Sequence, residues 1–592
     1  MKTLKKLKLL RSHMAKKRIK ACIVPSSDPH LSEYIPEHWK SRAWLSGFTG
    51  SSGTLVVTDK KAALWTDSRY FLQAEKELNG SGIDLCKMGL PETPTMEAWL
   101  IDVLKKKDIV AFDGRLLSHS MAKGLIFNLK SHGLKVDSNI DFIDKIWTNR
   151  PSIPKGKAFE QELRYSGKSV NEKLTEIREK LISLEANACI ISTLDDIAWT
   201  FNIRGNDVEY NPVVLSYGYI SLDKALLFID QLKIDDELVS RLNLEGVDVM
   251  DYQQIDKFIK RLPKNTIIAL DETRINHKLA SLIPKEVPIK RTLSIPTQLK
   301  AIKNPVELEN IRKSMVADGI AMCEFIYWLE NALGNEKITE LTIANKLLEL
   351  RKMQNGFVSE SFGTIAGYKE HGAIVHYSAT PESAFEVKPK GFLLVDSGGQ
   401  YYQGTTDITR TFHLSKPTKA EMRDYTLVLK GMIGLSMAKF PEGTRGCQLD
   451  ILARSAMWSN GINYGHGTGH GVGAFLNVHE GPQSIRPNEN PVTLEPGMIQ
   501  SNEPALYRTG KYGIRIENLI ACRQEEETEY GKFYGFETLT LCPIDTKPID
   551  ITLLLPEERE WLNNYHRLVF EKISPFLSEE VKVWLKAKTK EL

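Results

Sequence analysis

The sequence predicts a multidomain protein of the α/β and α+β classes, with two α/β domains followed by a larger α+β domain. Three observations predict this. The chain has 592 residues, more than one hydrophobic core usually holds. The strand and turn signals of residues 20–90 return at 188–230. Beyond residue 303, a pair of helix signals followed by strand signals occurs twice. We expect domains at 1–153, 154–302 and 303–592.

The composition is that of an ordinary globular protein, with 42% hydrophobic and 26% charged residues. Lys+Arg 78 against Asp+Glu 75 gives a net charge of +3, so we expect no nucleic-acid partner. No apolar run reaches the roughly 18–20 residues that cross a bilayer, so we expect no membrane partner. The seven cysteines are scattered and include no CxxC pair, which favours a reducing, cytoplasmic compartment.

The first residues, MKTLKKLKLLRSHMAKKRIK, are basic, and Leu4, Leu7, Leu10 and Met14 recur at helical spacing. The segment has no continuous apolar core, so it is not a secretory signal. A mitochondrial presequence is the alternative, because acidic residues are absent. We favour the first helix of a domain, since the strand-like ACIVP follows directly.

The two N-terminal domains look like a duplication. RAWLSGFTGSSGTLVVT and KAALWTDSRYF in the first resemble IAWTFNIRGND, PVVLSYGYI and KALLFID in the second, and Trp44 and Gly47 correspond to Trp199 and Gly205. Chance resemblance of two mixed α/β segments is the alternative. The linker NRPSIPKGK separates them, and a helix expected at 169–186 opens the second.

The third domain opens with a strong helix start, in which Asn304 is the N-cap, Pro305 is at N1 and Glu307 is at N3. Thr418 and Glu421 form a second capping box. Further helices are expected at 338–354, about 420–438, about 447–459 and from 556 to the C-terminal end.

Two aspartates lie on strand signals. Asp396 follows the buried run Phe392–Val395, and Asp407 precedes the run Ile408–Phe412. Glycines lie between the two runs, so we expect a hairpin across which the aspartates meet.

Three further candidate ligands follow: His470 in YGHGTGHGVG, Glu503 in PGMIQSNEP and Glu517 in YGIRIENLI. Arg515 lies two residues before Glu517 in a strand pattern, so the two share a face. Four carboxylates on partly buried strands are costly unless they hold cations. Carboxylates with one imidazole suit Mn²⁺, with Zn²⁺ and Co²⁺ as alternatives, and two such ions about 3.5–4 Å apart can share a hydroxide. Ordinary surface acids near turns are the alternative interpretation.

The ordered set Asp396, Asp407, His470, Glu503 and Glu517 resembles the metal ligands of the pita-bread metallopeptidases, which include methionine aminopeptidase, prolidase and aminopeptidase P. The segments GAIVHYSAT, HGTGHGVG, VHEGP and IRIENL are similar to those of the aminopeptidase P family, and the three-domain length resembles its large cytosolic form. The resemblance implies two creatinase-like N-terminal domains and a pita-bread catalytic domain.

The resemblance also implies a reaction and a ligand scheme. A hydroxide bridging two metal ions, expected to be Mn²⁺, would attack the carbonyl of the peptide bond that precedes a proline in second position. Asp407 and Glu517 would bridge both ions, Asp396 would hold one ion, and His470 and Glu503 would hold the other. Glu503 would also take the proton of the water, and the family implies a homodimer.

Further residues receive roles from the same resemblance. His376 and His479 would stabilise the reaction intermediate, and His466 would line the proline pocket. Arg515 would orient a carboxylate or close that pocket, and Arg69 would reach the substrate from the first domain. The residues alone leave ordinary structural roles open, such as an ion pair between Arg515 and a buried acid.

Two other functions stay open. A prolidase, cutting only dipeptides, would use the same chemistry, but the second N-terminal unit counts against it. A non-enzymatic pita-bread binding module is the other. Such modules lack the ligands and carry long acidic tails, whereas this chain has the ligands and ends in KAKTKEL.

Overall fold

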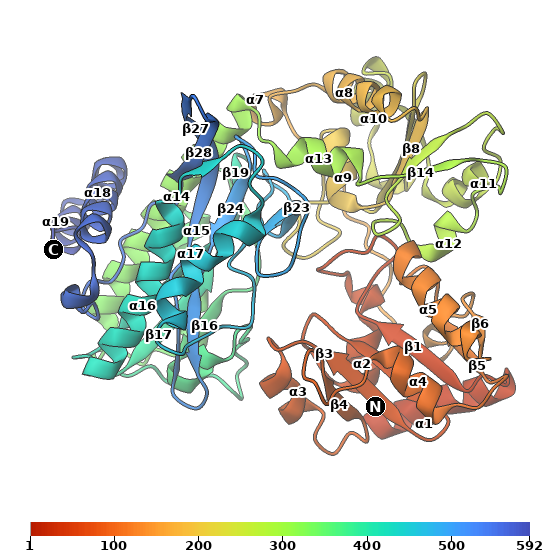
Figure 1. The fold of residues 1–592 in the computed structure, drawn as a ribbon, viewed down its shortest axis with the longest axis horizontal. Coiled ribbons are helices and arrows are strands. Elements are labelled where there is room, and N and C mark those ends of the chain that lie inside the picture. Colours follow the sequence, from red (N-terminus) through yellow and green to blue (C-terminus); the bar gives the residue numbers. More distant parts are fainter. Residues whose placement is uncertain (1) are drawn as a thin grey trace. The chain divides into compact units, whose positions relative to one another are not determined.

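The computed structural model describes residues 2–592, which divide into two compact units (Figure 1). Of the described residues, unit 1 comprises 2–162 with Lys168–Thr297, and unit 2 comprises Leu163–Gly167 with Gln298–Leu592. The boundary expected near residue 153 falls inside unit 1 and stays a prediction.

Unit 1 contains two six-stranded sheets with the same order of strands. The first sheet has the order β4 (Asp84–Lys87), β3 (Ala62–Thr66), β2 (Thr54–Thr58), β1 (Ala21–Pro25), β5 (Ile109–Phe112), β6 (Lys135–Asp137). The second has the order β12 (Asp248–Asp251), β11 (Ala225–Ile229), β10 (Ser216–Ser221), β8 (Ala188–Ile191), β13 (Ile268–Leu270), β14 (Ile289–Arg291).

The strand directions also match, since β1 and β8 each pair antiparallel with one neighbour and parallel with the other. Trp44 lies in α2 (Ser41–Ser46) after β1, and Trp199 lies in α9 (Leu194–Thr200) after β8. The two tryptophans therefore occupy equivalent places, and the predicted duplication is confirmed.

The N-terminal residues form helix α1 (Thr3–Lys16), in which Leu7, Leu10 and Met14 are buried. These side chains pack in one cluster with Cys22 and Val24 of β1. The interpretation as the first helix of a domain is confirmed. Leu4 does not share the buried face, because its side chain is 60% exposed.

The two sheets of unit 1 meet through equivalent residues. His119 N–H donates to the Ile275 carbonyl and His277 N–H donates to the Leu117 carbonyl, both at 2.8 Å. Counted from the ends of β5 and β13, Leu117 corresponds to Ile275 and His119 to His277. The two hydrogen bonds are therefore related by an approximate two-fold axis, as in an interface between two identical subunits. We call this region the seam.

Unit 1 contains further helices and a two-stranded sheet of β7 (Phe159–Glu160) and β9 (Ile203–Arg204). The helices are α3 (Phe71–Glu77), α4 (Met96–Val103), α5 (His119–Ser131), α6 (Ile143–Ile146), α8 (Val170–Ser183), α10 (Asp236–Leu244), α11 (Ile255–Ile259) and α12 (His277–Ala280).

Unit 2 begins its main fold with the predicted helix start. Asn304 Oδ1 accepts from Val306 N–H and Glu307 N–H, both at 3.0 Å, and a Glu307 oxygen accepts from Asn304 N–H at 2.9 Å. The capping box of Thr418 and Glu421 is confirmed as well. The helices are α13 (Ile295–Ala301), which enters the unit, α7 (Leu163–Ser166), α14 (Pro305–Ala332), α15 (Glu340–Lys352), α16 (Lys419–Ser436) and α17 (Gly446–Trp458).

Two helix pairs cover two groups of strands, which confirms the α+β domain built from two halves. Helices α14 and α15 share one apolar cluster with strands β16, β17 and β20 of the first half. Helices α16 and α17 share another with the six-stranded sheet of unit 2 (Figure 1). The strands of the first half are β15 (Phe357–Glu360), β16 (Ile365–Tyr368), β17 (Phe392–Ser397), β18 (Gly399–Tyr401), β19 (Gly404–Thr405) and β20 (Ile408–His413). Those of the second half are β21 (Phe440–Pro441), β22 (Gly469–Gly471), β23 (Glu480–Ile485), β24 (Ile499–Asn502), β25 (Ala505–Arg508), β26 (Tyr512–Arg515), β27 (Asn518–Thr528) and β28 (Gly531–Thr538).

The connection between the aspartate strands differs from the prediction. Strands β17 and β20 pair antiparallel, with Asp396 opposite Thr409. The residues between them are not a simple turn, because β18 and β19 pair with each other and β18 pairs with β15. The glycine-rich segment thus contains a second, smaller hairpin.

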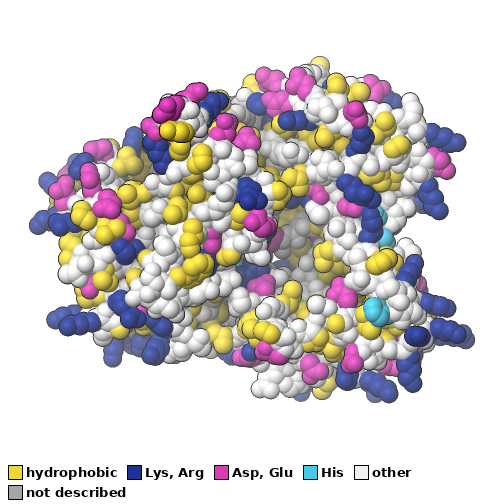
Figure 2. Space-filling view, viewed as in Figure 1, with side chains coloured by type: hydrophobic (Ala, Val, Ile, Leu, Met, Phe, Trp, Pro, Cys, Tyr) yellow, Lys and Arg dark blue, Asp and Glu magenta, His cyan; other side chains and the backbone are white. Residues whose placement is uncertain are grey.

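The C-terminal segment forms α18 (Pro556–Ile573) and α19 (Glu579–Lys588). The helix expected from residue 556 is confirmed but is divided in two, and Leu562, Tyr565 and Val569 are buried in a cluster that includes residues of α16. No helix within residues 2–592 is both long and apolar enough to span a bilayer. On the face drawn in Figure 2, basic and acidic side chains are interspersed on each unit, as the net charge of +3 leads one to expect.

Candidate metal centre

The five predicted ligands lie on neighbouring strands of unit 2. Asp396 is in β17 and Asp407 directly precedes β20, so both belong to the first half. His470 is in β22, Glu503 directly follows β24, and Glu517 directly precedes β27. Because Asn502 and Asn518 are paired across β24 and β27, the two glutamates lie opposite each other.

Distances show that these side chains converge. Ligand atoms of Asp407, His470 and Glu517 lie within 4.8 Å of one another. His470 Nε2 is 3.5 Å from Asp407 Oδ2 and 3.5 Å from Glu503 Oε1. Backbone bonds tie the halves together, since Glu517 N–H donates to the Thr409 carbonyl at 3.1 Å.

Asp396 joins the group through Arg515. Arg515 Nη2 contacts Asp396 Oδ2 at 2.6 Å, and both side chains are buried. Asp396 Oδ1 is also buried, yet no donor in residues 2–592 lies within hydrogen-bond distance of it. A buried carboxylate oxygen that no protein donor satisfies is what a cation ligand needs. The donor set therefore fits divalent metal ions.

Burial and mutual repulsion perturb the acids. Burial raises the pKa of Glu503 to about 7, with the charges of Asp407 and Asp396 adding to the rise and those of His470 and Arg515 opposing it. Burial, followed by the charges of Asp407, Glu503 and Asp396, raises the pKa of Glu517 well above its usual value. In the metal-free protein, protons on these carboxylates relieve their mutual repulsion, and bound cations can take the place of those protons.

The pKa of His470 is raised, although burial alone would lower it. Burial acts to lower its pKa, but the hydrogen bond to Asp407 and the charges of Glu503 and Asp407 outweigh burial and raise the pKa to about 9. The imidazole therefore holds a proton that a metal ion has to displace.

A chain of hydrogen bonds that the sequence analysis missed surrounds Arg515. Arg515 Nη1 donates to the Tyr507 hydroxyl at 2.6 Å, and Arg515 Nε donates to Thr409 Oγ1 at 3.1 Å. Thr409 Oγ1 in turn donates to Glu517 Oε2 at 2.7 Å. Thr409 had a sequence signal, because residues 407 and 409 share a face of a strand. Tyr507 had no such signal, because its partners Arg515 and His466 lie 8 and 41 positions away in the sequence.

Two of the predicted histidines lie beside this network. His466 Nε2 is 2.8 Å from the Tyr507 hydroxyl. The ring of His479 meets the ring of His470 edge-on, with centroids 4.4 Å apart. His376 is half-buried in the segment that follows β16.

The loop that carries His466 and His470 is tied to α17. Arg454 donates to the carbonyls of Tyr464 and His466 at 2.8 and 2.7 Å, and it pairs with Asp450 at 2.6 Å. Thr468 Oγ1 donates to Asp450 at 2.6 Å. One buried helical ion pair thus fixes the backbone before His470.

Arg69 belongs to unit 1, in the turn after β3. Its guanidinium is held by Asp67 of the same turn, at 2.7 Å from Nε and 2.8 Å from Nη2. The expected contact of Arg69 with the substrate stays a prediction.

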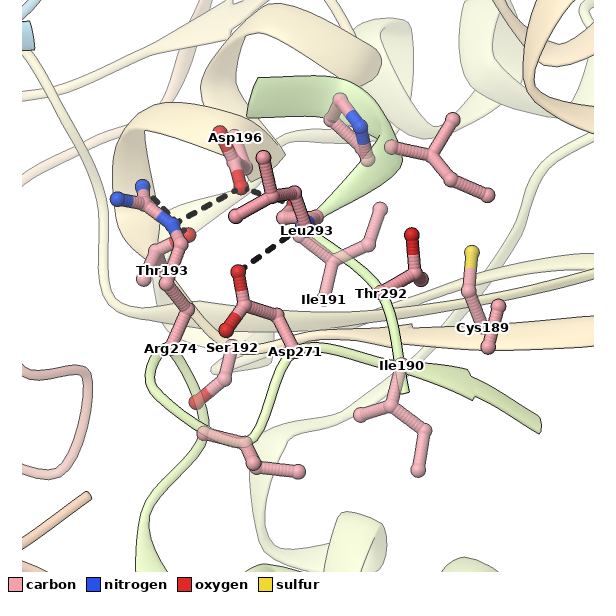
Figure 3. A pocket seen from close by; sticks show the side chains of 15 residues that line it. Cys189, Ile190, Ile191, Ser192, Thr193, Asp196, Asp271, Arg274, Thr292 and Leu293 are labelled. Carbon is pink, nitrogen blue, oxygen red and sulfur yellow. Dashed lines mark hydrogen bonds and ion pairs between the residues drawn. The ribbon is translucent and has the colours of Figure 1, made fainter. Parts of the chain in front are cut away.

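Unit 1 also contains a small pocket, lined by Arg274, Asp196 and Thr193 beside the ends of β8 and β13. Figure 3 shows Arg274 turned toward Asp196 and Thr193, with Nε 3.5 Å from the Asp196 carboxylate and Nη2 3.2 Å from the Thr193 hydroxyl. Ser294 Oγ donates to Asp196 at 2.6 Å. The cavity of about 20 Å³ holds roughly one water molecule, so it is too small for a peptide.

Comparison with known families assigns each part of the chain. Residues 309–524, which contain all five predicted ligands, match the metallopeptidase family M24. Residues 6–140 and 149–307 each match the creatinase/prolidase N-terminal domain, and residues 532–592 match the C-terminal region of peptidase M24.

Similarity extends over the full length. Aminopeptidase P2 of Arabidopsis thaliana is 42% identical, over 97% of this chain and 86% of that protein. The chain belongs to the aminopeptidase P family. The crystal structure of an X-prolyl aminopeptidase from Caenorhabditis elegans, described as a cytosolic enzyme with a di-nuclear active site, is 34% identical, covers 100% of both chains and superposes with a TM-score of 0.96.

Membership in the aminopeptidase P family confirms the predicted fold, two creatinase-like domains followed by a pita-bread metallopeptidase domain. An Xaa-Pro dipeptidase from Bacillus anthracis shares this fold more distantly, with 23% identity, a TM-score of 0.51, and coverage of 64% of this chain and 99% of that one. The similarity to the aminopeptidases thus includes a part of the chain that the dipeptidase lacks.

Proposed function

We propose that this chain is a metal-dependent Xaa-Pro aminopeptidase, which removes the N-terminal residue from peptides with proline in second position. The observation that carries the proposal is the convergence of four carboxylates and His470 on one buried spot of unit 2, where Asp396 Oδ1 has no donor from the described chain. Membership in the aminopeptidase P family supports the same activity.

Two divalent ions would be held by Asp396, Asp407, His470, Glu503 and Glu517. Mn²⁺ is the proposed metal because oxygen donors dominate the site, and Zn²⁺ or Co²⁺ would be accepted by the same donors. When bound, the ions would polarise the scissile carbonyl and lower the pKa of the attacking water. Asp407, His470 and Glu517 would contribute ligand atoms that already lie within 4.8 Å of one another.

Glu503 is the proposed general base. In the metal-free protein, burial raises the pKa of Glu503 to about 7. Bound cations would lower this pKa and keep the carboxylate ready to accept.

The neighbouring side chains would bind and orient the substrate. His479, edge-on to His470, and His376 would donate to the carbonyl oxygen as its negative charge develops. His466 would line the proline pocket from its position beside Tyr507. Arg515 would orient Asp396 rather than contact the peptide, because the guanidinium is buried against that carboxylate.

A bond to proline needs a dedicated site because its nitrogen carries no hydrogen and the ring fixes φ. A peptidase that reads the peptide N–H cannot recognise such a bond. The proposed substrates are therefore peptides rather than nucleic acids or lipids. We further propose a cytoplasmic homodimer, which is supported by the described cytosolic location of the C. elegans relative and by the family resemblance.

The test compares an Xaa-Pro-Pro tripeptide with a Gly-Pro dipeptide on the purified protein, before and after chelation and with Mn²⁺, Zn²⁺ or Co²⁺ restored. We expect rapid release of the first residue of the tripeptide, loss of activity with the metal, and the highest activity with Mn²⁺. Cleavage of the dipeptide alone would indicate a prolidase, and activity that survives metal removal would reject the metallopeptidase.

Metal content gives an independent measure. Asp407→Asn should lower the number of bound ions per chain, because one of the bridging carboxylates loses its charge. Elemental analysis of this variant and the parent checks the expectation, and light scattering of the same samples reports whether the chain is a dimer.

A further inference from the structure

A single buried carboxylate accepts several hydrogen bonds from one irregular segment of unit 2. Glu340, the first residue of α15, has a fully buried side chain. Its carboxylate accepts from Tyr368 N–H at 2.8 Å, Phe385 N–H at 2.8 Å, the Tyr377 hydroxyl at 2.9 Å and His371 Nδ1 at 2.9 Å. Its own N–H donates to the Phe385 carbonyl at 3.1 Å.

These partners span residues 368–385, which we call the His376 segment. Tyr368 is the last residue of β16, and a single 3-10 turn follows at Lys369–Ala373. The rest of the segment has no helix or strand, so its polar groups have no regular ladder to join. Glu340 bonds the segment at its start, in its middle and near its end. The position at the N-terminus of α15 also favours a negative charge there.

Aromatic contacts hold the same segment together. The His371 ring stacks on Phe385 with centroids 3.7 Å apart and on Tyr377 with centroids 4.3 Å apart. Tyr377 is therefore fixed by its hydroxyl and by its ring, and His376 is the residue directly before it.

The His376 segment lies against the strands of the candidate metal centre. It continues from β16, which pairs with β17 so that Ile365 is opposite Asp396. A Cβ on Gly513 of β26 would come within 1.7 Å of the Gly372 carbonyl oxygen, so only glycine permits this contact. Arg515, the partner of Asp396, lies two residues after Gly513.

We propose that Glu340 is a positioning residue that sets the location of His376 at the metal centre. This rests on the proposed function only in that His376 acts on the substrate. Without the Glu340 carboxylate, the N–H groups of Tyr368 and Phe385 and the His371 ring lose this acceptor, and the Tyr377 hydroxyl keeps only longer bonds, such as the one to the Ser383 carbonyl at 3.3 Å. The segment then has to move to find other acceptors. A displacement of about 1 Å at a catalytic group lowers turnover by roughly 10²-fold.

The test is a double-mutant cycle between Glu340→Gln and His376→Ala. Glutamine keeps the size of the side chain but turns one acceptor oxygen into a donor that faces other donors. Glu340→Gln should lower kcat on the tripeptide by about 10²-fold with the metal content and KM little changed. In the His376→Ala background the same substitution should have almost no further effect on kcat, because both changes remove the same interaction.

Asp207→Asn in unit 1 is the matched control. Asp207 is another buried carboxylate that accepts from two backbone N–H groups, those of Gly156 at 3.0 Å and Leu215 at 2.7 Å, and it pairs with Lys233. It should lower the melting temperature as Glu340→Gln does, but it should leave kcat unchanged in both backgrounds.

Hydrogen exchange separates this inference from the proposed function. In Glu340→Gln, amides of residues 368–385 should exchange faster while those of β20 stay protected, whether or not the protein cleaves Xaa-Pro bonds. Unchanged exchange in the segment would overturn the inference, as would equal losses of kcat in the two backgrounds. If Glu340→Gln does not fold, Tyr377→Phe, which removes one of the bonds, should show the same non-additivity to a smaller extent, and additivity there would also overturn it.

Discussion

Arg515 decides how the charges of the metal centre are arranged. It contacts Asp396, Thr409 and Tyr507 at once, and Thr409 passes the contact on to Glu517. The guanidinium thereby holds two acids of the site in fixed orientations without occupying Asp396 Oδ1. A planar fork of donors can do this, and a lysine ammonium cannot.

Glu503→Gln should fold normally and lose turnover by a factor of at least about 10², which is the usual contribution of a general base. Steady-state kinetics with metal content measured on the same sample checks the expectation. Near-normal turnover with full metal occupancy would exclude Glu503 as the base.

The metal-free protein should become less stable as the pH rises. The pKa of Glu503 goes from 4.5 to about 7 and that of His470 from 6.5 to about 9 on folding. The folded state therefore binds more protons than the unfolded chain between these values. The stability that Glu503 contributes is fully present below pH 4.5 and is lost by about pH 7. The stability that His470 contributes is fully present below pH 6.5 and is lost by about pH 9.

Melting temperatures of the metal-free and Mn²⁺-loaded proteins at about pH 6 and about pH 8.5 test this prediction. The metal-free protein should melt at the lower temperature at the higher pH. The loaded protein should show the reverse trend, because cations compete with protons for the same ligands. Parallel trends in the two forms would contradict the expected proton linkage.

At the scale of elements, the loop before β22 depends on α17. Arg454 joins the carbonyls of Tyr464 and His466 to that helix, and it is itself buried against Asp450. The glycines of this loop allow many conformations, so the ion pair selects one of them.

Arg454→Lys should lower the free energy of unfolding by about 2–4 kcal/mol, because one ammonium cannot reach all the acceptors that the guanidinium serves. Urea unfolding of the metal-free protein measures the change. Arg423→Lys in α16, whose side chain is 48% exposed, is the control and should change stability by less than about 0.5 kcal/mol. A loss no larger than that of the control would show that the loop is held elsewhere.

Elements with a strong local signal could be predicted from the sequence, and those that depend on distant partners could not. The capping box at Asn304 could be predicted because spacing alone identifies it. Asp407, His470 and Glu517, which the structure brings together, could be proposed as ligands from their strand and glycine contexts and from the resemblance of their order to a family of metallopeptidases. The hairpin of β18 and β19 was missed because both strands are short and one of them, β18, also pairs with β15. Glu340 was missed because all its partners lie at least 28 residues away.

At the scale of the whole molecule, the seam of unit 1 contains a pair of histidines. His119 Nδ1 and His277 Nδ1 lie 3.2 Å apart, and the rings stack with centroids separated by 5.3 Å. Burial lowers the pKa of both, and for His119, whose pKa falls to about 4, the charges of His277, Lys123 and Arg291 add to the effect while Glu272 opposes it.

The seam should therefore weaken in acid. Between about pH 4 and 6.5 the unfolded chain binds a proton that folded His119 does not, so stability falls as the pH drops through this window. In the Mn²⁺-loaded protein, His119→Gln should reduce the fall in melting temperature between about pH 7 and 5. An unchanged fall would assign the acid sensitivity to other groups.

The two sides of the seam belong to two similar sheets, each with its own stretch of sequence. In an assembly of identical subunits, one substitution alters both sides of the axis at the same time. Here a helix begins with Ser118 on one side and with Asn276 on the other, and each caps its own helix. One side can therefore change while its counterpart keeps the interface closed, which gives a fused pair more freedom to diverge than a dimer has.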